Sequence, residues 1–176
     1  MSQFEFIFIL VSIILGLALA NLFGGIARLF RKSWDQVDGI HLVFSLITIL
    51  MVFVVWWGMY RWQGHSQFEF EAFVVIGLYT SVFYSLSVIL FPQDGSIVDF
   101  DEARKSYYIA LIIMLFFEVA HYSVGEFEPP GYYGYVWGFA FVLLSAAIWM
   151  KQRWLDGLVA AFIFLLYSGW WFVAKF

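Results

Sequence analysis

The stretch that decides the fold runs from Phe4 to Arg28 and reads FEFIFILVSIILGLALANLFGGIAR. Apart from Glu5, Ser12, Asn21 and the terminal Arg28, it is built of apolar and small residues on every side, so it has no water-facing stripe. At about 1.5 Å per residue, a helix of this length exceeds the hydrocarbon core of a bilayer, which is about 30 Å thick. The stretch therefore predicts a helix that crosses a membrane.

The rest of the 176-residue chain has the same character. Hydrophobic residues make up 64% of it, aromatic residues 23% and charged residues 12%, whereas a soluble domain has roughly 45–50% apolar and about 25% charged residues. The chain has no cysteine and a net charge of −4. This composition excludes a disordered chain, a disulfide scaffold and a nucleic-acid binder. We expect an integral membrane protein with membrane lipids as its partners.

Five further apolar runs are long enough to span a bilayer. The six predicted spans lie at about 4–28, 40–60, 72–91, 107–124, 132–150 and 155–174. All three prolines fall between these runs, where their missing N–H leaves no carbonyl unpaired in lipid. The runs also lack the apolar–polar alternation of a membrane barrel. We expect an all-α polytopic bundle of six transmembrane helices, forming one domain over residues 1–176.

The basic residues predict the orientation of the bundle. One side of the predicted topology carries Arg28, Arg31, Lys32, Arg104, Lys105, Lys151 and Arg153, and the other carries Arg61 and Lys175. Because basic loops stay in the cytoplasm, this bias predicts that both termini lie outside.

Several short motifs resemble those of a group of small, uncharacterised bacterial polytopic membrane proteins. They are Glu5-Phe6, Ile14-Leu15-Gly16-Leu17, Gly25-Ile26-Ala27-Arg28-Leu29, His41-Leu42, Trp56-Trp57-Gly58, Leu90-Phe91-Pro92 and Tyr107-Tyr108. The likeness covers about the first 120 residues. It implies a multi-pass protein of the bacterial inner membrane and carries no activity with it.

One carboxylate lies well inside a predicted span. Glu118 is about 11 residues, or roughly 16 Å, from the inner end of the fourth span, close to the midplane, and a charge there costs about 2.5–3.5 kcal/mol on insertion scales. His121 and Tyr122 follow one turn later on the same face. Three further polar residues reach the same region from other spans: Ser81, Tyr84 and Tyr167. We predict that Glu118 faces the bundle.

Three interpretations of this polar cluster stay open. It is a satisfied structural network, a pathway for a proton, ion or substrate, or a metal or haem site. Glu118 and His121 form a single Glu-x-x-His element, whereas di-iron bundles need two. His41 and His121 lie at different depths, which disfavours haem, and only a weak metal site of His65 and His121 is left. We therefore expect no cofactor besides lipid.

Polar residues also lie near the inner side. Asn21 is expected to form an interhelical hydrogen bond. Arg28 and His41 flank the first inner turn, where they could bind a lipid phosphate, although snorkelling alone explains Arg28 equally well.

Small residues at four-residue spacing indicate helix packing, within the chain or between chains. They are Ser12, Gly16, Ala20 and Gly24 in the first span, Gly77, Ser81 and Ser85 in the third, and Gly134 and Gly138 in the fifth.

Two functions follow from these patterns. The first is a pathway or binding site for a proton, ion or small molecule around Glu118. The alternative is a non-catalytic subunit of a homo-oligomer or of a larger membrane complex. No catalytic triad, HExxH motif or phosphate loop is present, so no catalytic residue is expected and a membrane enzyme ranks third.

Overall fold

The computed structural model describes residues 2–31, 37–60, 70–96, 98–124 and 131–173. Side chains within helical residues 121–124 and 170–173 are not described. The described residues form six helices: α1 (Gln3–Leu29), α2 (Gly39–Gly58), α3 (Phe70–Leu90), α4 (Phe100–Val124), α5 (Tyr133–Met150) and α6 (Arg153–Val173). The predicted all-α class is confirmed.

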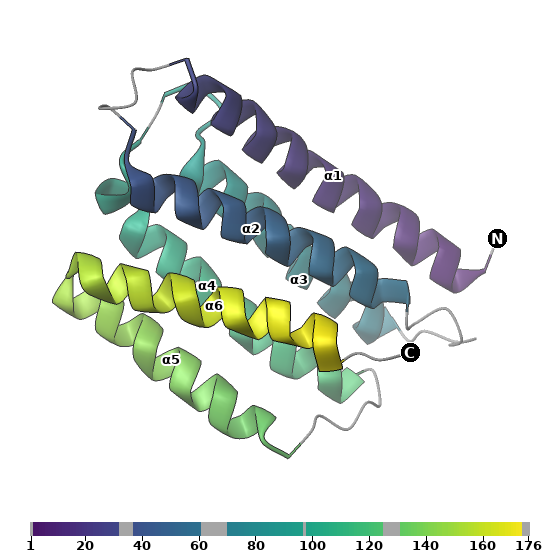
Figure 1. Cartoon of the computed structure of the whole chain (residues 1–176). Coiled ribbons are helices and arrows are strands. Elements are labelled where there is room, and N and C mark those ends of the chain that lie inside the picture. The colour runs from purple at the N-terminus through teal and green to yellow at the C-terminus, as the bar shows by residue number, and fades with distance from the viewer. Residues whose placement is uncertain (1, 32–36, 61–69, 97, 125–130, 174–176) are drawn as a thin grey trace.

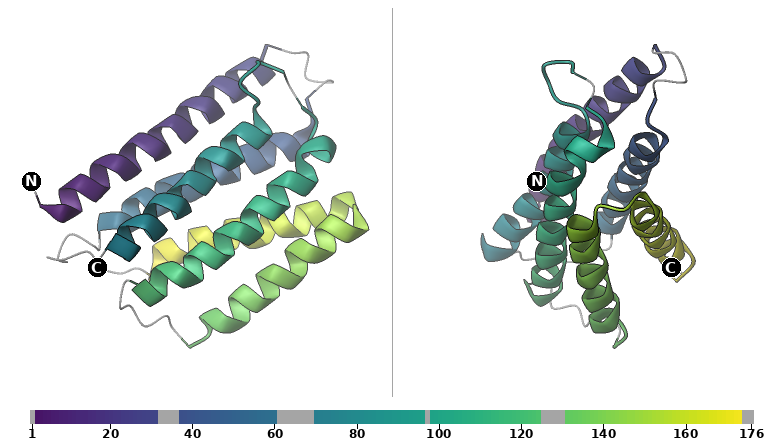
Figure 2. Two further views of the ribbon diagram at one scale, coloured as in Figure 1. Left: turned by 180° about the vertical axis from the view of Figure 1, so that it is seen from behind. Right: turned by 90° about the vertical axis from the view of Figure 1, so that its left-hand side faces the viewer.

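The six helices lie alongside one another and alternate in direction (Figures 1 and 2). α1 begins and α6 ends at the same end of the bundle, which we name the terminal end (Figure 1). α2, α4 and α6 begin at the opposite end, where Asp38, Asp101, Arg104, Arg153 and Asp156 gather; we name it the charged end.

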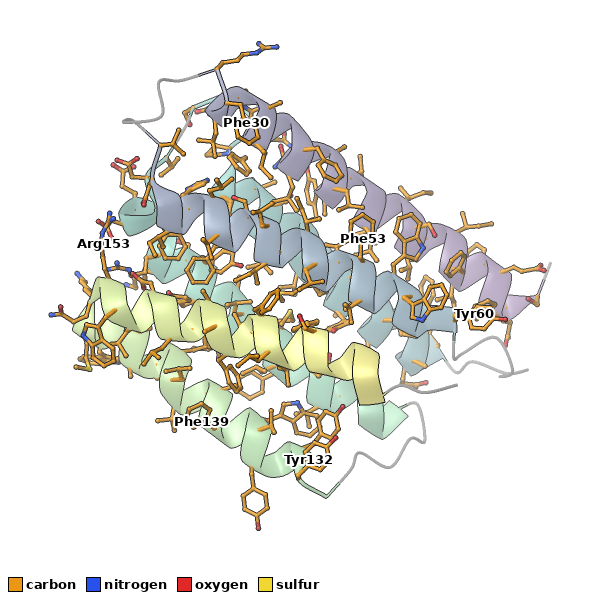
Figure 3. The ribbon with its side chains drawn as sticks, in the orientation of Figure 1. Phe30, Phe53, Tyr60, Tyr132, Phe139 and Arg153 are labelled. Carbon is orange, nitrogen blue, oxygen red and sulfur yellow. The ribbon has the colours of Figure 1, made fainter. Side chains whose placement is uncertain are left out.

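Within the described part of the chain, four helices, α1, α2, α3 and α5, are long and apolar enough to cross a membrane. α4 and α6 have 25 and 21 residues and, like α1 and α3, carry acidic residues in their first turns: Asp101 and Glu102 in α4, and Asp156 in α6. Large apolar side chains cover the outside of the bundle, as Phe53 and Phe139 illustrate (Figure 3). A surface this apolar fits lipid and not water, which supports a membrane protein.

Each helix packs against two or three neighbours and the six close into a ring. α1 packs on α3 and α2, α4 on α3 and α5, and α6 on α2 and α5, while α2 also contacts α3. The space between α2 and α4 near the charged end is filled by four fully buried aromatic side chains: Phe44, Phe100, Tyr107 and Tyr108. The Phe44 and Phe100 rings stack with centroids 4.4 Å apart. We name these four residues the aromatic layer.

Among the described glycines of α1, Gly25 has the closest neighbour, Phe91, which directly follows α3. A Cβ atom added there would lie 2.1 Å from Cγ of the fully buried Phe91 ring. The predicted small-residue ridge lies on a neighbouring face: a Cβ at Gly16 would meet nothing within 4 Å, and one at Gly24 only the Arg28 side chain. Gly25, beside the predicted ridge, therefore sets the α1–α3 distance.

The other small residues lie in looser surroundings. Ala20 and Ser85 are exposed, and Ser12 is partly buried. A Cβ at Gly77 would meet Leu10 at an ordinary 4.0 Å, and one at Gly134 or Gly138 nothing within 4 Å. In α5 the predicted packing face is thus open on this chain.

The connection between α3 and α4 contains a turn at Asp94-Gly95. Gly95 has φ +79°, a left-handed conformation that favours glycine. Its N–H donates to the Pro92 carbonyl, and the N–H of Ser96 donates to Asp94 Oδ1 over 2.9 Å. The hydrogen bonds from Ser96 lower the pKa of the Asp94 carboxyl below its ordinary value.

The Gly25 contact yields a stability prediction. Gly25→Ala forces a methyl group into the Phe91 ring, which cannot swing away because it is fully buried. Overpacking of this kind costs about 1–3 kcal/mol, so we expect a lower thermal unfolding midpoint in detergent. Gly16→Ala is the matched control and should leave the midpoint unchanged or raise it. Equal midpoints for the two variants would contradict the close approach at Gly25.

Candidate functional site

The first candidate site is a hydrogen-bonded link between three helices. Tyr79 of α3 is hydrogen bonded to the Glu118 side chain of α4 and to the Tyr167 side chain of α6. Tyr79 is 5% exposed, whereas Glu118 and Tyr167 are only partly buried. The hydrogen bond from Tyr79 turns the carboxyl group toward α3. We name these three residues the tyrosine–glutamate link.

The link crosses the inside of the ring. α3 and α4 pack against each other, but α3 and α6 are not among the helix pairs in extensive contact. The Tyr79 and Tyr167 side chains therefore cover the distance that separates their backbones. Long side chains with polar tips can do this because their apolar bodies are buried while their hydroxyl groups meet.

Tyr79 was not among the residues predicted to join Glu118. The prediction named Ser81 and Tyr84, but the Ser81 hydroxyl donates to the Gly77 carbonyl over 2.7 Å and the Tyr84 hydroxyl is contacted by the Gln93 side-chain amide. The predicted depth of Glu118 was counted from residue 107, but α4 begins at Phe100, so Glu118 lies nearer the terminal end of the bundle. Counted from the terminal end, the depth of Glu118 is closer to that of Tyr79 than to that of Tyr84.

The predicted histidines are only partly covered by the structure. His121 and Tyr122 belong to α4, but their side chains lie outside the described part, and His65 lies outside the described residues altogether. Among the described residues no group of three His, Cys, Asp or Glu side chains could hold a metal ion. The weak metal site of His65 and His121 thus stays a prediction.

The second candidate site is a buried ion pair between α4 and α6 at the charged end. Nη2 of Arg104 contacts Oδ2 of Asp156, and the Tyr108 hydroxyl donates to Oδ1 of the same carboxylate over 2.7 Å. Asp156 has no exposed surface and Arg104 is 6% exposed. Arg104 also contacts Oδ1 of Asp101 over 2.7 Å, one turn earlier in α4. From the sequence, Arg104 was predicted only to be an inner basic residue, and Asp156 was not predicted to belong to a site.

A more exposed set of contacts surrounds this pair. The Asp38 carboxylate caps two helices, because Oδ1 accepts from the N–H of Ile40 in α2 and Oδ2 from the N–H of Phe100 in α4. Arg153, at the start of α6, contacts Asp38 at 3.5 Å and Asp101 at 3.2 Å (Figure 3). The starts of α2, α4 and α6 are therefore joined by side chains of alternating charge.

The predicted inner polar residues gather where α1 and α3 end. The Asn21 side-chain amide donates to the carbonyls of Ser87 and Phe91, each over 2.9 Å, which is the expected interhelical hydrogen bond. The His41 ring is 1% exposed and packs edge-on against Phe91. A lipid phosphate at the surface therefore cannot reach it. Arg28 is partly buried and lies close enough to Asp94 to interact electrostatically.

Comparisons with protein-family models, with curated proteins and with solved structures gave no match to this chain. The resemblance to small bacterial polytopic proteins stays a prediction from the quoted motifs. The two polar sites themselves are therefore the basis on which a function is inferred.

The double cap at Asp38 yields a second prediction. Asp38→Ala removes the acceptor for two helix N-termini, and loss of one such cap costs about 1 kcal/mol. We expect a larger fall in the thermal unfolding midpoint than a single cap gives. Asp38→Asn keeps an acceptor oxygen and should lose less. If Asp38→Ala and Asp38→Asn unfold at the same temperature, the ion pair with Arg153 matters and the caps do not.

Proposed function

We propose that this chain is a six-span protein of the bacterial inner membrane that binds or conducts a proton, ion or small molecule at Glu118. The observation that carries the proposal is the tyrosine–glutamate link. It brings one carboxyl and two phenol groups from three helices to one place inside the ring.

The site chemistry supports this function. A carboxylate in a membrane span is costly, about 2.5–3.5 kcal/mol near the helix centre, and is usually retained for function. Glu118 keeps part of its surface exposed, so a proton or small cation can approach it. The Tyr79 hydroxyl stabilises the charged carboxylate, and Tyr167 is hydrogen bonded to Tyr79, so a proton can pass along the hydrogen bonds between the three groups.

The proposed topology has both termini outside and the charged end in the cytoplasm. α4 and α6 lie alongside the four apolar helices (Figure 2) and have 25 and 21 residues, which suffices for about 30 Å of hydrocarbon. Their charged first turns then lie at the cytoplasmic headgroups. Arg28, Arg104 and Arg153 all lie at this end, as the positive-inside rule requires.

A second function is a non-catalytic subunit that assembles with itself or with a larger membrane complex. The observation that favours it is the open face of α5, where Gly134 and Gly138 meet no neighbouring side chain within 4 Å. Small residues that leave a helix face open permit close approach of another helix in lipid.

Replacing Glu118 separates the two functions. We expect Glu118→Gln to abolish proton or cation flux, or proton-coupled uptake, in proteoliposomes, because the amide cannot lose a proton or carry the charge. Glu71→Gln, on the exposed first turn of α3, is the matched control and should keep wild-type flux. Unchanged flux in Glu118→Gln would reject the site, and loss of assembly with unchanged flux would support the subunit.

The proposed orientation of the bundle in the membrane can be measured separately. Because the chain contains no cysteine, Gly131→Cys and Gln152→Cys each introduce a single thiol at an exposed position, on opposite ends of the bundle. In intact cells whose outer membrane has been made permeable, an impermeant thiol reagent should label Gly131→Cys and spare Gln152→Cys. The reverse pattern would place the charged end outside.

A further inference from the structure

Buried side chains fill the interior of the bundle at the charged end. We infer that the ion pair of Arg104 and Asp156, with its hydrogen bond from Tyr108, is a latch that keeps this end closed. Its release opens a route from the charged end toward Glu118. This inference rests on the proposed function, since it describes how access to the same site is controlled.

The latch joins two helices that have little else to hold them together at this end. α4 packs on α3 and α5, and α6 packs on α2 and α5, whereas α4 and α6 are not among the extensively packed pairs. In the described part of the chain, Arg104 and Tyr108 reach across to Asp156 in the buried interior. Arg153 of α6 contacts Asp101 of α4 at the exposed edge. The separation of α4 and α6 in the buried part of the charged end therefore depends on Arg104, Tyr108 and Asp156.

Burial of this pair argues for a role other than stability. Asp156 has no exposed surface, and a buried ion pair loses in desolvation much of what it gains by attraction, so apolar residues of similar size often serve equally well. Breaking one partner, in contrast, leaves a buried charge and forces a rearrangement. A contact of this kind has two distinct states, joined and broken, as a latch needs.

Alternative partners for the latch residues are already in place. Arg104 keeps Asp101 when it leaves Asp156, because both carboxylates contact the same Nη2 atom. α6 stays tethered through Arg153, which contacts Asp38 and Asp101. When the latch opens, Arg104 therefore loses Asp156 but keeps the Asp101 carboxylate as its partner.

Tyr108 couples the latch to the aromatic layer. Its hydroxyl donates to Asp156, while its ring lies 5.9 Å from the ring of Phe44 and 5.8 Å from that of Phe100, both edge-on. Next to it, the Tyr107 hydroxyl is hydrogen bonded to Oγ1 of Thr48 over 2.8 Å. A displacement of Asp156 thus loosens the residues that fill the interior between α2 and α4.

The two polar sites differ in exposure. Glu118 is partly exposed, whereas Asp156 and the aromatic layer are fully buried. Between them on α4 and α6 lie the buried apolar side chains of Leu111, Met114, Val159 and Ile163. The described side chains of this stretch of α4 and α6 offer a proton or ion no polar partner, and this supports an arrangement that is closed toward the charged end.

Thiol labelling tests the latch directly. Thr48→Cys places the only cysteine of the chain at a fully buried position beside Tyr107. An impermeant, charged thiol reagent is applied from the charged end in inverted membrane vesicles. We expect slow labelling with the latch intact and, because a protected site reacts only through its open fraction, a rise of at least about tenfold when Asp156→Asn is added.

Three further variants keep this test decisive. Tyr108→Phe removes one hydrogen bond but keeps the ring, and should raise labelling by a smaller factor. Arg104→Asp combined with Asp156→Arg restores a pair of opposite charge and should restore protection. Asp101→Asn breaks only contacts of an exposed carboxylate and should leave labelling slow. Unchanged labelling in both Asp156→Asn and Tyr108→Phe, or equally fast labelling in Asp101→Asn, would overturn the latch.

General loosening of the bundle is excluded by a thiol elsewhere in the core. Ala18→Cys lies at a fully buried position of α1, and Asp156→Asn should not speed its labelling; if it does, the latch is rejected. These labelling rates are measured without a flux assay and do not depend on the function of Glu118. Fast labelling in Asp156→Asn together with normal flux in Glu118→Gln would therefore reject the site at Glu118 and keep the latch.

Discussion

Arg104 and Asp156 meet in the interior at the charged end, and the arrangement of α4 and α6 depends on that contact. The guanidinium and carboxylate satisfy each other where neither can reach water, and Tyr108 supplies a third group. Asp38 extends the connection to α2 by capping both α2 and α4. Three helices that begin at the charged end are thereby fixed by polar contacts, in addition to the apolar packing of the bundle.

Both candidate sites use the same pair of helices. α4 supplies Arg104, Tyr108 and Glu118, and α6 supplies Asp156 and Tyr167. Along each helix the two sites are separated by about three turns of buried apolar residues. A shift of α6 relative to α4 at one site is therefore transmitted along rigid helices to the other, which gives the proposed site and the proposed latch a common mechanical basis.

The sequence predicted features that depend on one helix at a time. The six helices and the hydrogen bonding of Asn21 follow from apolar length and from the cost of an unpaired amide in lipid. Partners from other helices were harder to foresee. Glu118 was singled out together with Ser81 and Tyr84, but its hydrogen-bond partner is Tyr79. A difference of about one helical turn in depth or rotation decides which side chain of α3 reaches the carboxyl group.

By itself, the sequence determined that this is a helical membrane protein, because long apolar runs leave few other ways to satisfy the backbone in lipid. It also marked Glu118, since an ionisable residue inside such a run is conspicuous. Only the tertiary structure decided that Gly25, beside the predicted ridge, sets the distance between α1 and α3, and that Asp156 is buried against Arg104. Both depend on how helices far apart in the chain are rotated against one another, and helix periodicity in one segment carries no information about that rotation.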